Sequence, residues 1–245
     1  MSFQKTLNKI VFNKYTIPFT PFYKKYPFYS CTSIGSANER GCIDYELGLF
    51  YNRVPKASNS TIVSNLVRLK LAEEISSKQA KNIFRKPSSL SIREVEKFEA
   101  LFKFTFVRDP FSRTLSAYLD KIDRCLNKNT EYSGEFISFK DFLNSLKNGK
   151  LYSNLHWAPQ TSILLIPLDD FDFIGKFENL NEDLAFVMSK VKGQTLIESD
   201  FSKEGPPSTK ASDKIKKYYD AECVELIQKM YSKDFELLGY NNTIG

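Results

Sequence analysis

The sequence has very little histidine and no clustered cysteine. His156 is the only histidine in 245 residues, and the cysteines at Cys31, Cys42, Cys125 and Cys223 are scattered, without a CxxC pair. Because metal-ligand spacing is absent, we expect no structural zinc site. Scattered cysteines favour free thiols in a reducing compartment, although a Cys31–Cys42 disulfide is compatible with the sequence.

Long hydrophobic runs are also missing. No stretch approaches the ~20 apolar residues that are needed to span a bilayer. The N-terminal apolar run is too short for a secretory signal. We therefore expect a cytoplasmic protein without a transmembrane segment.

What the sequence has is an ordinary core and a mild positive charge. Hydrophobic residues make up 42% and aromatic residues 14%, which favours a packed core over a disordered chain. The net charge of +6 suits an anionic ligand, but 29 acidic residues are interspersed, so nothing here argues for nucleic acid. The length fits one α/β domain, with 1–40 as a peripheral N-terminal segment and 41–245 as the core.

The stretch KFTFVRDPFSRTLSAYLDK organises the rest of the chain. Phe104–Val107 is typical of a buried strand, and Asp109 and Pro110 suit the N-cap and first turn of a following helix. Arg108 thus lies at the carboxyl end of a strand, where α/β sheets bind ligands, and Ser116 lies two turns into the helix. The two side chains could hold one phosphate; a surface arginine and a buried serine are an equally good interpretation.

A second strand–loop–helix unit lies upstream. Leu47–Val54 is typical of a strand, and apolar residues recur at helical spacing from Ile62 to about Ser76. The loop Lys56–Thr61 between them carries small hydroxylated residues that let backbone N–H groups approach an anion, and Lys56 adds a mobile positive charge. The loop has no glycine and its lysine comes first, so it departs from the GxxxxGK[ST] pattern of ATPases and kinases.

The remaining chain continues the alternation of strands and helices. We expect a loop at 77–90, a helix at Ser91–Leu101 with a Ser91/Glu94 capping box, a helix at Phe139–Leu146, a strand at Phe171–Phe177, a helix at Asn181–Val191 and one long helix at Lys214–Lys233. This order predicts an α/β fold with a central parallel sheet flanked by helices.

Several of these stretches resemble a known family. YNRVPKASNSTI, FTFVRDPFSRTLSAYLDK, HWAPQ and FDFIGKFENLNEDL are similar to segments of carbohydrate sulfotransferases, above all the chondroitin, dermatan and HNK-1 sulfotransferase branch and its bacterial relatives. The resemblance runs in order from about Leu47 to Tyr240. It implies a three-layer fold like that of P-loop NTPases. It also implies transfer of a sulfuryl group from 3'-phosphoadenosine 5'-phosphosulfate (PAPS) to a hydroxyl of a carbohydrate or glycolipid, with adenosine 3',5'-bisphosphate as product.

The resemblance implies roles for residues of this chain. The 5'-phosphosulfate would lie in the loop made by Lys56, Ala57, Ser58, Asn59, Ser60 and Thr61. Arg108 and Ser116 would hold the 3'-phosphate. The loop 208–210, which includes Thr209 and Lys210, would close over the nucleotide; a flexible surface loop is the alternative. Lys56 would stabilise the charge that develops on the leaving oxygen, so that no metal is required.

The acceptor hydroxyl also needs a general base, and its identity stays open. His156 is the obvious candidate as the only histidine, but a packing histidine is an equally good interpretation. Arg113 either contacts the nucleotide or forms an i,i+4 pair with Asp109, and Arg53 faces either the donor or solvent.

Two other functions stay open on the sequence alone. One is a P-loop kinase-like nucleotide-binding enzyme, against which the missing GxxxxGK[ST] argues. The other is a non-catalytic glycan-binding relative that keeps only the fold. For the leading interpretation we expect a glycan or another hydroxyl-bearing small molecule as the acceptor, and no nucleic-acid partner.

Overall fold

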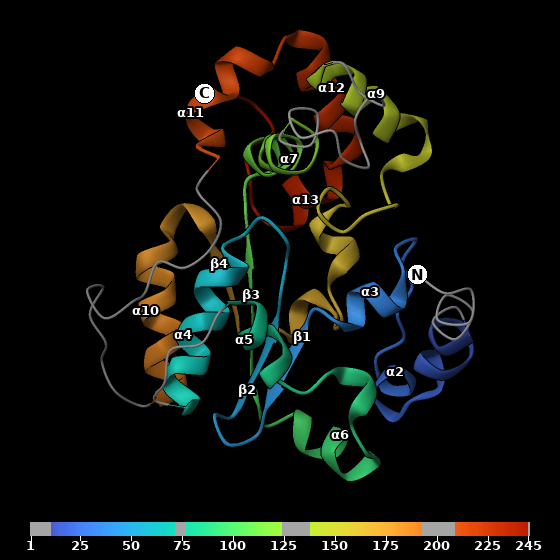
Figure 1. Cartoon of the computed structure of the whole chain (residues 1–245), viewed down its shortest axis with the longest axis vertical. Helices are drawn as coiled ribbons and strands as arrows, with labels where there is room; N and C mark the ends of the chain where they lie inside the picture. The colour runs from blue at the N-terminus through green and yellow to red at the C-terminus, as the bar shows by residue number, and fades with distance from the viewer. Residues whose placement is uncertain (1–10, 72–76, 124–137, 193–208, 245) are drawn as a thin grey trace.

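The computed structural model of the chain describes residues 11–71, 77–123, 138–192 and 209–244. Across these residues the centre is a four-stranded sheet in the order β1-β2-β3-β4. The strands are Gly41–Asp44, Leu49–Asn52, Phe102–Val107 and Phe173–Lys176. β2, β3 and β4 run parallel, while β1 pairs antiparallel with β2 (Figure 1). The predicted α/β class is confirmed, but the expected wholly parallel sheet has one antiparallel edge strand.

Side chains of β2 alternate between two helical layers. The helices on one face are α4 (Asn59–Leu71), α5 (Ser77–Ile83) and α10 (Leu180–Lys192). Leu49 and Tyr51 point to that face, while Phe50 between them packs on the opposite face with Phe98 of α6 (Ile92–Phe98). Figure 1 shows α4, α5 and α10 together on one side of the sheet and α2 and α6 on the other. The result is three layers, as in P-loop NTPases.

The N-terminal segment is anchored to the second face by aromatic side chains. It contains η1 (Phe12–Thr16), η2 (Ile17–Phe19), α2 (Pro21–Lys25) and α3 (Ile34–Asn38). Phe22 and Tyr26 both pack edge-on against Phe98, with ring centroids 5.2 and 5.6 Å away. Aromatic contacts of this kind bury much apolar area per residue, so they tie the segment to α6.

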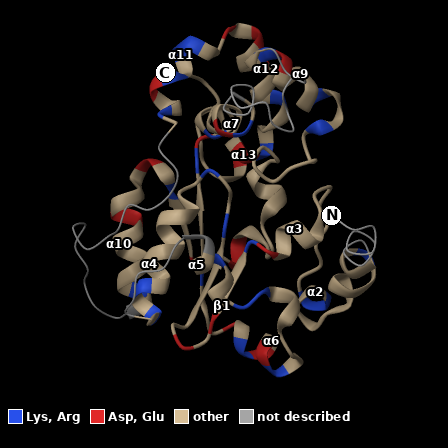
Figure 2. Cartoon of the chain, viewed as in Figure 1, with Lys and Arg blue, Asp and Glu red and all other residues tan. Residues whose placement is uncertain are grey.

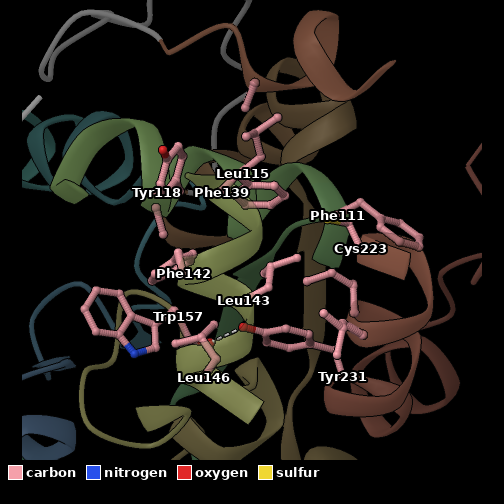
Figure 3. Packing of buried hydrophobic residues seen from close by; sticks show 14 of the residues in the cluster. Phe111, Leu115, Tyr118, Phe139, Phe142, Leu143, Leu146, Trp157, Cys223 and Tyr231 are labelled. Carbon is pink, nitrogen blue, oxygen red and sulfur yellow. Dashed lines mark hydrogen bonds between the residues drawn. The ribbon is translucent and has the colours of Figure 1, made fainter. Parts of the chain in front are cut away.

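A group of helices stands beyond the carboxyl edge of the sheet (Figure 1). Its members are α7 (Pro110–Tyr118), α9 (Phe139–Ser145), α11 (Ala211–Tyr218), α12 (Ala221–Met230) and α13 (Ser232–Leu237). Figure 3 shows Phe111 and Tyr118 of α7 in one apolar cluster with Phe142 and Tyr231. The Tyr231 hydroxyl donates a hydrogen bond to the Trp157 carbonyl oxygen at 2.6 Å. This cluster holds α7 in a fixed position at the sheet edge.

The local signals at several helix ends are confirmed. The Asp109 carboxylate accepts a hydrogen bond from the Ser112 backbone N–H at 2.8 Å and so caps α7. The Ser91 backbone N–H donates to Glu94 Oε2 at 2.8 Å, which is half of the predicted capping box of α6. The predicted helix at Phe139–Leu146 is also present as α9.

Two expectations for the secondary structure are wrong. The segment 77–90 is not a plain loop, because it holds α5 and the short 3-10 helix η3 (Pro87–Ser89). The long helix predicted at Lys214–Lys233 is divided among α11, α12 and α13. Its break follows from Asp220, whose carboxylate accepts the Cys223 backbone N–H at 2.7 Å and starts α12.

Two further observations concern membrane spans and thiols. Within the described ranges, no helix is both long and apolar enough to cross a lipid bilayer. Cys31, Cys42 and Cys223 are free thiols, while Cys125 lies outside the described residues.

Candidate active site

The two predicted anion-binding units meet at one edge of the sheet. β2 and β3 are parallel neighbours, with Asn52 paired to Thr105, so the segments that follow them emerge side by side. Arg108 Nη1 lies 3.3 Å from the Lys56 carbonyl oxygen and donates to it. The structure therefore brings Arg108 to the loop Lys56–Thr61, although 52 residues separate them in the chain.

The loop Lys56–Thr61 has an uncommon backbone. Lys56 (φ 71°) and Ser58 (φ 55°) are left-handed, a conformation that residues other than glycine rarely adopt. Ala57 between them is not left-handed, and such alternation turns successive N–H groups toward one point, as in anion-binding nests. α4 begins directly afterwards at Asn59 and adds the N–H groups of its first turn. A loop without glycine has thus acquired the backbone geometry of an anion site.

The Lys56 ammonium lies in a partly buried ion pair. Its Nζ is 3.1 Å from Asp120 Oδ2, and Asp120 also contacts Lys121 Nζ at 3.3 Å. Burial lowers the pKa of Lys56, and the carboxylate of Asp120 offsets only part of that effect. Burial alone would raise the pKa of Asp120, but Lys56 and Lys121 outweigh it and hold that pKa below the usual value. The carboxylate of Asp120 thus favours the charged form of Lys56.

Arg108 is buried but weakly held at the end of its guanidinium. Nε donates to Ser112 Oγ at 3.1 Å, and Nη2 reaches Ser212 Oγ only at 3.4 Å. The guanidinium carbon lies 3.9 Å from the centre of the Phe177 ring, a cation–π contact. Burial lowers the pKa of Arg108 to about 10, with Glu178 raising it, so the side chain stays charged at neutral pH. Its long Nη contacts are ones that an anion with better geometry can replace.

Ser116 and Thr209 are brought together as well. Their hydroxyl oxygens are 3.1 Å apart, across 93 residues of sequence. Thr209 is followed by Lys210, which is exposed, has a left-handed backbone (φ 48°) and precedes α11. The segment that carries Thr209 therefore lies over α7, while Ser208 falls outside the described residues.

His156 lies beside the same cations. Asn154 Oδ1 accepts the His156 backbone N–H at 3.0 Å and lies 2.8 Å from Nδ1 of the ring. An amide oxygen has no proton to donate and can only accept a hydrogen bond. Nδ1 therefore carries the proton, and Nε2 keeps a lone pair. Burial, together with the nearby cations of Lys121, Arg40 and Lys56, lowers the pKa of His156 to about 3. The imidazole is therefore neutral at physiological pH.

Comparison with known proteins fits this geometry. A model described as "Sulfotransferase family" matches residues 42–241, which include Lys56, Arg108, Ser116, His156 and Thr209. The chain belongs to the sulfotransferase family. This confirms the resemblance that the sequence motifs indicated.

Several curated relatives of the chain are carbohydrate sulfotransferases. It is 24% identical to carbohydrate sulfotransferase 10 of Xenopus laevis over 231 residues, covering 78% of this chain and 64% of the relative. It is 30% identical to carbohydrate sulfotransferase 14 of Mus musculus over 37% of this chain and 29% of the relative. It is 24% identical to carbohydrate sulfotransferase 8 of Homo sapiens over 56% of this chain and 38% of the relative. The chain thus spans less than two thirds of each of these relatives, and no solved structure matches it significantly.

Arg113 in this sulfotransferase motif differs from both of its predicted roles. Its side chain is 1% exposed and all three guanidinium nitrogens donate to backbone carbonyl oxygens. The acceptors are Pro55 at 3.0 Å, Ala158 at 2.9 Å and Leu155 at 3.0 Å. No ion pair with Asp109 forms, because the nitrogens point into the interior. Arg113 fastens the Lys56 loop to the segment that carries His156.

Gln160 is a positioning residue that sequence reasoning missed. Its Oε1 accepts the Arg108 backbone N–H at 2.9 Å and its Nε2 donates to the Arg108 carbonyl oxygen at 2.7 Å. Asp234 of α13 in turn accepts the Gln160 backbone N–H at 2.7 Å. The HWAPQ stretch therefore fixes the backbone of Arg108 by a two-point amide clamp. The signal was present in the motif, but its partner cannot be read from spacing.

The site as a whole offers anion binding and a proton acceptor. Backbone N–H groups, Lys56, Arg108 and paired hydroxyls provide positive or donor groups, and a neutral imidazole lies nearby. Among the residues described, no group of three or more His, Cys, Asp or Glu side chains is arranged to hold a metal ion. The arrangement suits in-line transfer of a charged group between two anchored oxygens.

Proposed function

We propose that this sulfotransferase-family protein moves the sulfuryl group of PAPS to a hydroxyl of a carbohydrate or glycolipid acceptor. The observation that carries the proposal is the meeting of the Lys56–Thr61 loop with Arg108 and Ser116 at one sheet edge. A donor with separate phosphates at its 3' and 5' positions needs two anion sites, which a single Walker loop does not supply.

The donor is proposed to bind across both units. The 5'-phosphosulfate lies on the N–H groups from Lys56 to Thr61 and the first turn of α4. The 3'-phosphate takes the fork of Arg108 and the hydroxyl groups of Ser116 and Thr209, replacing the contacts at 3.1 to 3.4 Å that these groups make with one another and with neighbours. Lys210, exposed beside Thr209, adds positive charge.

The chemistry follows from charge and proton balance. The acceptor oxygen forms a bond to sulfur while the bond between sulfur and the bridging phosphate oxygen breaks, and adenosine 3',5'-bisphosphate leaves. Lys56 stabilises the negative charge on the leaving oxygen once the donor competes with Asp120 for its ammonium. His156 Nε2 accepts the proton of the acceptor hydroxyl.

The surroundings of His156 explain how so weak a base can act. Burial, together with the nearby cations, holds the pKa of His156 at about 3, well below the optimum for proton transfer at neutral pH. A bound donor brings several negative charges beside Lys56, and these raise the pKa of the imidazole. Donor binding thus prepares the base, so that proton transfer is favoured only in the loaded site.

The test is the thermal shift of the protein with adenosine 3',5'-bisphosphate, repeated on Arg108→Ala. A ligand at 100 times its Kd stabilises the folded state by about 2.7 kcal/mol, and we expect the variant to lose most of that shift. Arg108→Lys keeps the charge without the fork and should recover part of it. Stabilisation by ATP and not by the bisphosphate would replace this proposal with a kinase-like enzyme. Bisphosphate binding without transfer to any hydroxyl acceptor would indicate a non-catalytic relative.

A further inference from the structure

The outer side of the N-terminal segment carries large apolar side chains that face solvent. Val11, Phe12, Tyr15 and Phe19 are all exposed, and the last two have 60% and 65% of their surface accessible. We call these four residues the apolar stripe. Single exposed apolar residues are common on proteins, but a group this dense marks a surface that binds something.

The backbone gathers the apolar stripe on one side of a short helical stretch. Val11 has a right-handed helical backbone, and η1 and η2 continue the stretch to Phe19. Residues four positions apart lie on the same side of such a stretch, which groups Val11, Tyr15 and Phe19. Phe12 precedes Tyr15 by three positions and lies on that side as well. The stripe is therefore one continuous surface.

The opposite side of the same stretch is fixed to the body of the protein. Ile17 is buried and packs in one cluster with Phe22 and Phe98. Asn13, four positions before Ile17, lies directly over Gly35 of α3, where a Cβ atom would clash with the Asn13 amide. Because Asn13 and Ile17 hold the inner side, the apolar stripe is presented outward in a fixed position.

The same part of the chain is positively charged and contains no acidic residue. Residues 1–38 include five lysines and no Asp or Glu. The lysines are Lys5, Lys9, Lys14, Lys24 and Lys25. Lys14 lies within the stretch that carries the stripe, and Figure 2 shows basic residues on α2, which packs beside η2.

Two of these lysines have charges that the rest of the described structure does not neutralise. Lys14 and Lys24 are exposed, and neither forms an ion pair with a carboxylate within 11–71, 77–123, 138–192 or 209–244. Lys25 differs, because its Nζ pairs with Glu99. Lys5 and Lys9 lie outside the described residues. The neighbourhood of the apolar stripe thus presents free positive charge.

Exposed aromatic rings beside lysines, without acidic groups, match the surface of an anionic lipid bilayer. The rings can enter the boundary between the headgroups and the acyl chains, where aromatic side chains are favoured. Lysines near such a surface are attracted by the anionic headgroups. A second copy of the chain is a poorer occupant, because a symmetric contact through this surface would place lysines against lysines.

We infer that the apolar stripe and its neighbouring lysines dock on an anionic lipid bilayer, so that the protein lies on a membrane surface without spanning it. The inference is independent of the proposed transfer, because no residue of the stripe belongs to the candidate active site. Figure 1 shows α2 and α3 on the side of the sheet away from α4 and α10. Docking through the N-terminal segment therefore leaves the face with α4 and α10 uncovered.

The experiment is co-sedimentation of the full chain with sucrose-loaded vesicles. One set contains phosphatidylcholine alone, and the other contains phosphatidylcholine with an equal amount of phosphatidylserine. We expect the protein to sediment with the mixed vesicles and to remain largely in solution with the neutral ones. Raising the salt from about 0.1 M to about 1 M shortens the Debye length from about 10 Å to about 3 Å and should release the protein.

Variants assign the binding to this surface. Lys14→Gln with Lys24→Gln should lower the partition coefficient by about fivefold for each lysine. Tyr15→Ser with Phe19→Ser should lower it by about tenfold or more, because two rings no longer leave water. All four side chains are exposed, so the fold should persist.

The matched controls lie on α13. Lys233→Gln removes an exposed lysine, and Leu237→Ser removes an apolar side chain that is half exposed. Both controls should keep the wild-type partition coefficient. Affinity for adenosine 3',5'-bisphosphate should stay unchanged in the stripe and lysine variants, which keeps this test separate from that of the donor site.

Several outcomes would overturn the inference. Equal sedimentation with neutral and mixed vesicles, or with neither, removes the anionic bilayer as the partner. An unchanged partition coefficient in both double variants moves the binding to another surface. Analytical ultracentrifugation tests the remaining occupant: a dimer that Tyr15→Ser with Phe19→Ser abolishes would make the stripe an interface between copies of the chain.

Discussion

Arg113 and Arg108 belong to the same strand–helix unit, but their surroundings differ in kind. Every guanidinium nitrogen of Arg113 donates to a backbone carbonyl oxygen at 2.9 or 3.0 Å. Arg108 instead ends in contacts of 3.3 and 3.4 Å and stacks on Phe177. Arg113 is held by short hydrogen bonds in the interior, whereas the outer nitrogens of Arg108 make only long ones at the sheet edge. Because both arginines are buried, the length of their hydrogen bonds, and not burial, distinguishes Arg113 from Arg108, which we propose as a ligand-binding residue.

The largest effect on stability is expected from the removal of Arg113. Arg113→Met should destabilise the protein by about 3–5 kcal/mol, because three buried carbonyl oxygens lose their donors together. Urea unfolding measures the change, with Arg93→Met on the exposed side of α6 as the control. A loss below about 1 kcal/mol, or a weakened bisphosphate affinity in a fully stable variant, would place Arg113 with the ligand-binding group instead.

The largest effect on catalysis is expected from the removal of the Lys56 side chain. Lys56→Ala should lower kcat by about a hundredfold to a thousandfold, because the charge on the leaving oxygen develops only in the transition state. The stability of the variant should change little, because Asp120 keeps its second ion pair, with Lys121, when Lys56 is removed. Steady-state kinetics and bisphosphate titration measure the two effects, with Lys97→Ala as the control. If affinity for the bisphosphate falls as far as kcat, Lys56 contributes uniform binding rather than transition-state stabilisation.

The strand–helix units could be predicted from sequence because their signals are local. The apolar run Phe104–Val107 and the helix-capping residue Asp109 lie within a few positions of one another. The structure has β3 and α7 at these positions. The strand β1 was missed because four residues, Gly41–Asp44, are too few to show a period. The helix α5 was missed because SKQAKNI has almost no apolar residues, and its position depends on Ala80 packing in the core beside α4.

The positions of the candidate site residues show the same contrast between local and distant signals. Lys56 and Arg108 could be placed from the sequence because each lies shortly after a strand, and Ser116 because it lies on the helix that follows Arg108. Thr209 was suggested only by the family resemblance. The clamp of Gln160 on Arg108 joins residues 52 positions apart, and the Asp120 pair with Lys56 joins residues 64 positions apart. Contacts over such separations depend on how the layers close. Only the i,i+4 spacing from Ser116 to Asp120 could have indicated that a carboxylate follows the hydroxyl along the same face.

His156 tests how strongly burial and the neighbouring cations lower the pKa of a side chain in the candidate site. Its folded-state pKa is lowered from 6.5 to about 3, so the unfolded chain binds a proton that the folded protein refuses. Stability from this group is complete above pH 6.5 and is lost as the pH falls toward 3, by about 1–3 kcal/mol between pH 7 and pH 4. Urea unfolding of wild type and His156→Gln should show this extra loss in wild type only.

Because His156 is the only histidine, its ring proton gives an unambiguous signal in an NMR titration. The folded protein should show no midpoint between pH 5 and pH 8, and addition of adenosine 3',5'-bisphosphate should raise the pKa. A midpoint near 6.5 in the unliganded protein would mean that neither burial nor the surrounding cations lower the pKa of the ring. It would also remove the argument that donor binding prepares the base.

The smallest effect is expected from Asp109, which follows Arg108 and caps α7. Its carboxylate caps α7 through the Ser112 N–H, and its backbone N–H donates to Glu178 Oε1 at 2.9 Å. Asp109→Ala should cost about 1 kcal/mol of stability, since only the cap is lost. Asp109→Asn, which keeps a capping oxygen, should cost less. Bisphosphate affinity should fall less than in Arg108→Ala, because Asp109 supports the helix and does not contact the donor. An affinity loss equal to that of Arg108→Ala would show that α7 must be capped for Arg108 to bind its phosphate.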